Sequence, residues 1–88
     1  MVRDDAEACL QAYQFAELAL SDFASKSEKE KRHALATASQ LRDEVAARYT
    51  RVASGEQQAP EQRVTAVKAA KAQLELHLAD AERLTPLE

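Results

Sequence analysis

Glutamate and histidine stand three residues apart in Glu30-Lys31-Arg32-His33, the spacing with which carboxylate-bridged di-iron bundles hold their metal. In such bundles both side chains project inward from one helix, and a second copy of the motif completes the site. The present sequence contains one copy, and neither side chain lies in the direction of Leu41 on the same predicted helix. Ser27 precedes Glu30 by three residues, which is the pattern of a capping box. We therefore expect Glu30 to cap a helix, His33 to be solvated, and no metal or other cofactor to be bound.

His77 and Cys9 are the other side chains that could serve as a base or a nucleophile. His77 lies beside an apolar stripe and could face Tyr13 or Tyr49, which is the one enzyme hypothesis that the sequence offers. A general base needs a group that orients it, and no Asp or Glu lies on the predicted inner faces. Cys9 lies in the middle of an apolar face, where a thiol behaves as a small hydrophobe with a raised pKa. We therefore expect no catalytic activity.

Charge is unevenly distributed along the chain. Residues 1–25 carry a net charge of −4, whereas residues 26–51 carry +3. A nucleic-acid groove needs a continuous positive stripe, and the cations of the second region are scattered round its predicted helix. The cations within that helix are Lys29, Lys31, Arg32, Arg42, Arg48 and Arg51. A regulator that binds nucleic acid through this helix is an alternative function, but the alternation of charge favours helices that pack side by side.

The composition predicts that helices position all of these residues. The 88 residues include one glycine, two prolines and 19 alanines. Alanine is the best helix former, but it buries little apolar area, so the expected core is thin and its helices approach closely. We predict a single all-α domain over residues 1–86, with helices over about 4–24, 28–53 and 60–84. Their matched lengths favour an antiparallel up-down-up three-helix bundle.

Each predicted helix carries one apolar stripe with spacings of three and four residues, and these stripes should form the core. The stripes are Ala6, Cys9, Ala12, Tyr13, Ala16, Leu20 and Phe23; Ala34, Ala38, Leu41, Val45, Tyr49 and Val52; and Val67, Ala70, Leu74, Leu78 and Ala81.

The two turns between these helices are signalled unequally. Gly55 stands where a left-handed residue ends a helix, and Pro60 suits the first turn of the next one. Residues 25–33 contain neither glycine nor proline, so the first turn depends on polarity and on the Ser27 cap. If residues 4–53 formed one helix, the inner faces of its halves would lie within about 40° of each other. A long helix in an intertwined dimer is therefore the alternative fold.

Several large apolar residues fall outside the predicted core and could form an interface: Leu10, Phe15, Leu18, Leu35 and Leu76. We expect a small protein-interaction or oligomerisation module, adaptor- or chaperone-like, that binds an amphipathic helix of another protein or its own copy. The layout resembles microtubule-interacting-and-trafficking domains and the small helical chaperones of bacterial secretion systems in architecture and size alone, and no residue is carried over from either.

The expected location is the cytoplasm. A single cysteine excludes an intrachain disulfide and fits a reducing compartment, and no signal peptide is recognisable. The longest uncharged stretch, Ala8 to Ala16, is far shorter than the roughly 20 residues of a membrane span, so we expect no membrane partner. Residues 87–88 look like a cloning remnant.

Overall fold

The part of the chain that its computed structural model describes, residues 4–56 and 58–85, is mostly helical. The elements are α1 (Asp5–Ala19), a 3-10 turn η1 (Phe23–Ser25), α2 (Glu28–Glu44), α3 (Ala46–Ser54) and α4 (Glu61–Leu84). No strand occurs within these ranges, which confirms the all-α class. None of the described helices combines the length and the apolar character that crossing a membrane would require.

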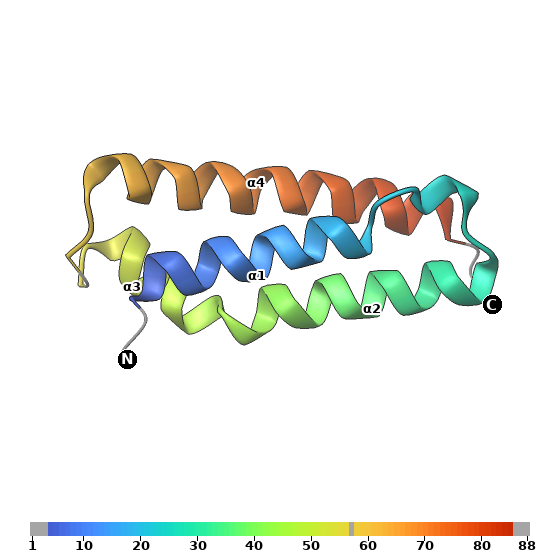
Figure 1. Cartoon of the computed structure of the whole chain (residues 1–88), viewed down its shortest axis with the longest axis horizontal. Helices are drawn as coiled ribbons and strands as arrows, with labels where there is room; N and C mark the ends of the chain where they lie inside the picture. The colour runs from blue at the N-terminus through green and yellow to red at the C-terminus, as the bar shows by residue number, and fades with distance from the viewer. Residues whose placement is uncertain (1–3, 57, 86–88) are drawn as a thin grey trace.

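The three long helices lie side by side along an elongated molecule of 43 × 24 × 20 Å, with α1 between α2 and α4 (Figure 1). The chain reverses direction after α1 and again after α3, so α3 and the start of α4 lie at the same end as the start of α1. Helix α1 packs against α2, α3 and α4. Its contacts are the most extensive of any helix, and because it lies between the other two long helices in Figure 1 it is here called the central helix.

The first turn begins earlier and is longer than the sequence predicts. Helix α1 ends at Ala19 rather than near residue 24, and Asp22 then takes a left-handed conformation with φ 54°. A 3-10 turn follows, and α2 begins with the predicted capping box, in which the Ser27 hydroxyl accepts from the Glu30 amide and Glu30 Oε1 accepts from the Ser27 amide. The single helix over residues 4–53 that the intertwined dimer requires is thus interrupted.

The predicted helix over residues 28–53 is two helices, separated at Val45. This residue has φ −105° and ψ 11°, outside the usual helical range. The Sγ atom of Cys9, in α1, lies 3.9 Å from the Val45 carbonyl oxygen. The break therefore coincides with a contact from the central helix, and no glycine or proline accompanies it.

The second turn is close to its prediction. Gly55 is left-handed, with φ 84°, and ends α3. Pro60 is the N-cap of α4 rather than a first-turn residue, and its carbonyl accepts from the amides of Arg63 and Val64. Helix α4 ends at Leu84 with Thr85 as its cap. Pro86 and the suspected remnant at residues 87–88 lie outside the described residues.

The core follows the predicted stripes and consists mainly of small side chains. On α1 the buried apolar residues are Ala6, Cys9, Ala12, Tyr13 and Ala16. They pack with Ala38, Val45, Val52, Val67, Leu74 and Leu78 in one cluster, and Phe23 forms a second cluster with Ala34 and Ala81 at the first turn. Leu20, Leu41, Tyr49 and Ala70 are partly buried at the margin of the main cluster.

Candidate functional site

The outer side of α1 exposes two large apolar side chains one helical turn apart. Phe15 is 57% exposed and Leu18 is 63% exposed. Spacing of three residues places them on neighbouring positions of one helix face. Because α1 is the central helix, this face has a junction with α2 on one side and a junction with α4 on the other.

Phe15 borders a hollow between α1 and α2, here named the acidic hollow, with a volume of about 540 Å³. Its lining residues are Ala8, Gln11, Ala12, Phe15, Leu41, Glu44, Val45 and Arg48. The floor is made of small or aliphatic side chains, and Glu44 and Arg48 stand at the rim. Arg48 is paired with Asp5 at 3.5 Å, which leaves Glu44 as the rim charge without a described ion-pair partner.

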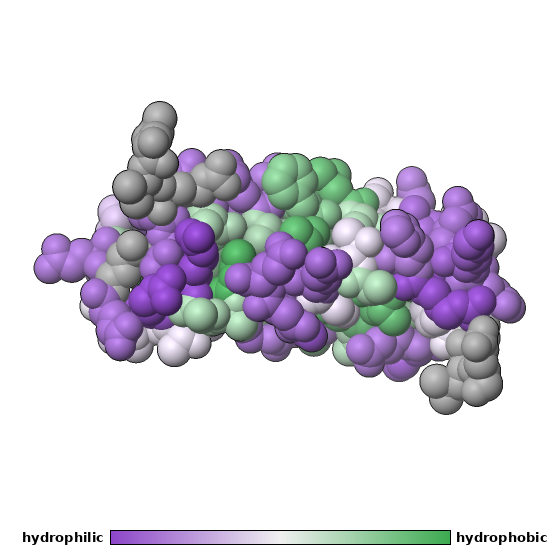
Figure 2. Space-filling model, turned by 90° about the horizontal axis from the view of Figure 1, so that it is seen from below, coloured by the Kyte–Doolittle hydropathy of each residue, from purple (hydrophilic) through white to green (hydrophobic). Residues whose placement is uncertain are grey.

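A second hollow follows along the same helix junction and is here named the basic hollow. It is lined by Ala19, Lys26, Lys29, Glu30, His33, Ala34 and Thr37. On α1, Ala8, Ala12, Phe15 and Ala19 succeed one another at spacings of four, three and four residues, so both hollows lie on the same side of that helix. Figure 2 shows the face on which α2 lies, with apolar side chains in its middle part around a group of polar ones, and mainly polar side chains toward both ends.

Leu18 borders a third hollow, between α1 and α4, with Leu20, Phe23 and the exposed Leu84. His77 is on its wall and faces Glu17, whose carboxylate oxygens lie 2.6 and 2.8 Å from Nδ1. The expectation that His77 lacks a carboxylate partner is therefore wrong. Glu17 lies on the flank of α1 and reaches across the junction between α1 and α4. A search restricted to acidic residues on the inner faces could not find this partner.

The tyrosines expected beside His77 have other surroundings. The Tyr13 hydroxyl is buried without a hydrogen-bond partner among the described residues, and burial raises the pKa of Tyr13. The Lys71 Nζ atom lies over the Tyr49 ring, 4.9 Å from the ring centroid. No hydrogen bond among the described residues joins either tyrosine to His77, whose carboxylate partner is Glu17.

The other residues predicted for the interface are distributed over different parts of the fold. Leu10 is partly buried against the main cluster, and Leu35 is partly buried against both clusters. Leu76 is 68% exposed and lies about 160° round α4 from Leu74 and Leu78, opposite its buried stripe. The structure thus brings Phe15 and Leu18 together and leaves Leu76 on another side. Leu84, which is 51% exposed, is an apolar surface residue that the sequence analysis missed.

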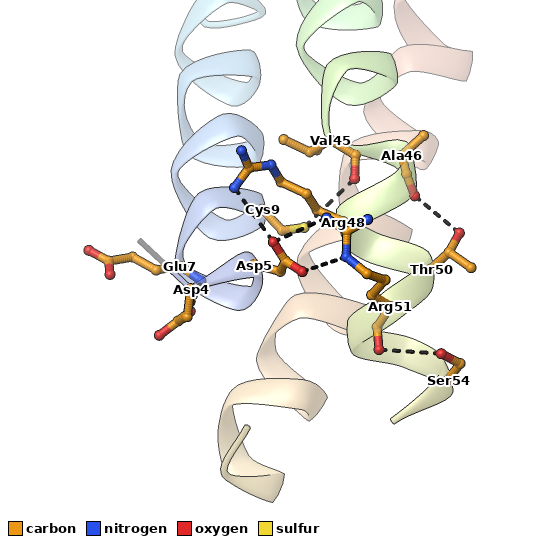
Figure 3. Close-up of polar contacts among 10 residues, drawn as sticks. All are labelled: Asp4, Asp5, Glu7, Cys9, Val45, Ala46, Arg48, Thr50, Arg51 and Ser54. Atoms are coloured by element: carbon orange, nitrogen blue, oxygen red, sulfur yellow. Dashed lines mark hydrogen bonds and ion pairs between the residues drawn. The ribbon is translucent and has the colours of Figure 1, made fainter. Parts of the chain in front are cut away.

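A buried carboxylate at the start of α1 is the strongest electrostatic feature. Asp5 is 7% exposed, and its Oδ2 accepts from Arg51 Nε at 2.8 Å while Arg48 approaches Oδ1 (Figure 3). The hydrogen bond from Arg51 holds the pKa of Asp5 below its ordinary value, against the opposing effect of burial. The pair ties α3 to α1. In the sequence, only the alternation of acidic and basic regions indicated an ion pair of this kind.

Cys9, Glu30 and His33 are the remaining candidates for chemistry. Cys9 is fully buried, and burial raises the pKa of its thiol, as predicted. Glu30 caps α2, and the hydrogen bond from the Ser27 amide lowers its pKa. His33 is exposed. No group of three or more potential ligands among the described residues could hold a metal ion.

The basic residues of the second region are largely engaged within the chain. Arg48 and Arg51 pair with Asp5, and Arg42 pairs with Asp43. Lys31 donates to the Leu84 carbonyl oxygen. The ion pairs with Asp5 and Asp43 offset part of the positive charge of this region.

Comparison with known protein families, curated proteins and solved structures finds no match to this chain.

Proposed function

We propose that this chain is a small protein-interaction module that docks through the outer face of α1. Exposure of Phe15 and Leu18, each beside a hollow whose lining includes apolar side chains, is the observation that carries the proposal. Singly exposed apolar residues are common on protein surfaces, but two of them one turn apart, each bordering a hollow, form a continuous apolar surface. The occupant is an apolar helix face, either of another protein or of a second copy.

The arrangement of the helices supports this use. In the proposed up-down-up bundle, α2 and α3 together form the second leg, and α1 is held between that leg and α4. Of its five buried apolar residues, three are alanine and one is cysteine, so the neighbouring helices approach closely, while Phe15 and Leu18 lie outside. The module has no catalytic role in this proposal, and the single buried cysteine is compatible with a cytoplasmic location.

Three variants test the proposal by changing one exposed apolar residue each: Phe15→Ser, Leu18→Asp and Leu76→Asp. The readouts are weight-average mass by sedimentation equilibrium and binding of a fluorescent 18-residue amphipathic helix of leucine and lysine. We expect the parent to self-associate or to bind the peptide, and both α1 variants to lose that property with unchanged helix content in circular dichroism. Leu76→Asp is the matched control on α4. If the three variants all behave like the parent, the α1 face is not an interface.

A further inference from the structure

The face formed by α1 and α2 has opposite charges at its two ends. Glu44 stands at the rim of the acidic hollow, at the end of the molecule where α1 begins (Figure 1). Lys26, Lys29 and His33 stand around the basic hollow at the other end, together with Glu30, whose carboxylate accepts from the Ser27 amide. Within the described residues neither Glu44 nor Lys29 forms an ion pair, and both side chains are exposed. The apolar part of the face lies between these ends.

One stripe of α2 carries this charge gradient. Lys29, His33, Ala36, Gln40 and Glu44 follow one another at spacings of four, three, four and four residues, and all five are exposed. Residues with this spacing lie along one side of a helix. If a second α2 is laid antiparallel on this stripe, Lys29 of each copy opposes Glu44 of the other, and His33 opposes Gln40. Ala36 lies near the centre, where its small side chain lets two helices approach closely.

We infer that this face binds a second copy of the chain in an antiparallel, two-fold symmetric dimer, an inference that rests on the proposed interaction function. A two-fold axis requires a self-complementary surface, and a stripe that is basic at one end and acidic at the other meets that requirement. The axis places the acidic hollow of one copy over the basic hollow of the other. Phe15 then packs against the alanine-lined floor of the second copy, which includes Ala19 and Ala34.

The molecule is large enough to form an interface of standard size with a second copy. A standard interface buries about 800 Å² per partner. The long faces of a molecule that measures 43 × 24 × 20 Å are large enough to supply that area. A core built largely from alanine also leaves a chain of this size with little apolar area to bury on its own, so a shared face stabilises it.

Charge exchange between two single variants tests the inference. Glu44→Lys alone places lysine against lysine in the dimer, and Lys29→Glu alone places glutamate against glutamate. Each should raise the dimer dissociation constant by about tenfold or more at low salt, because like charges are brought together. An equimolar mixture of the two should recover the parent's dissociation constant, since both inter-chain pairs become opposite in charge. The double variant Lys29→Glu/Glu44→Lys should self-associate like the parent.

The matched control makes the same charge changes on the exposed side of α4, with Lys68→Glu and Glu61→Lys, which should each dimerise like the parent. Sedimentation equilibrium gives the dissociation constants, and capture of an untagged variant by a tagged one identifies the mixed dimer. A parent that stays monomeric, or a mixture that associates no better than its components, overturns the antiparallel dimer. Loss of leucine-lysine peptide binding in Phe15→Ser would in that case still support an interaction module with a foreign partner.

Discussion

The inward and outward sides of α1 differ in the size of their side chains. Its inward side consists mainly of small residues that are almost completely buried, among them Ala6, Cys9 and Ala16. Its outward side carries Phe15 and Leu18, which are more than half exposed. Tyr13 is the one large side chain that α1 places in the main cluster. Close packing of small residues thus holds the bundle together, and the proposed contact with a second molecule uses the large residues on the opposite side of the same helix.

The largest expected effect on stability comes from two leucines on α4, which extend the comparison of inward and outward sides to a second helix. Leu74 is fully buried in the main cluster, whereas Leu76 is 68% exposed. We expect Leu74→Ala to lower the free energy of unfolding by about 2–5 kcal/mol, because it removes buried methyl groups and leaves a cavity. Leu76→Ala should change it by no more than about 0.5 kcal/mol. Urea denaturation followed by circular dichroism measures both, and equal losses would contradict the assignment of inner and outer sides.

An intermediate effect is expected when the inward side of α1 is made larger. Ala16 has no exposed surface. Ala16→Leu should lower the free energy of unfolding by about 1–3 kcal/mol, because a closely packed interior has no room for three additional carbon atoms. Leu18→Ala, two residues away, should leave stability nearly unchanged. The same denaturation measurement applies. An Ala16→Leu variant as stable as the parent would show that the helices are less closely packed around α1 than the burial indicates.

Local patterns in the sequence determined much of this fold. The apolar stripes identified the buried residues of α1 and α4, because helical periodicity is a local property. The capping box at Ser27 and the left-handed Gly55 were likewise readable from neighbouring residues. The end of α1 at Ala19 was not, since residues 20–24 continue the apolar stripe that the 3-10 turn uses to bury Phe23.

The features that were missed depend on residues far apart in the sequence. Asp5 and Arg51 are separated by 46 positions, Glu17 and His77 by 60, and the Cys9 contact at the Val45 break by 36. Charge alternation indicated that such pairs should exist, but it could not select the partners. For the candidate site, the sequence named Phe15 and Leu18 correctly as exposed residues, whereas the hollows beside them required the relative placement of three helices.

The smallest expected effect concerns the one charged residue on the inward side of α1. The hydrogen bond from Arg51 holds the pKa of Asp5 below its ordinary value of 3.8, so the folded state favours the ionised form. A carboxyl whose pKa is lower in the folded state stabilises the fold above its unfolded pKa, and this stabilisation is lost as the pH falls through the folded value. The free energy of unfolding should therefore decrease below about pH 4 in the parent.

Asp5→Asn and Arg51→Gln should each flatten that decrease, while the remaining slope reports other carboxyls such as Glu30, whose pKa is also lowered. Urea denaturation at a series of pH values measures the slopes. A parent slope retained in both variants would mean that the Asp5 pair, although buried, does not couple the inward side of α1 to acid stability.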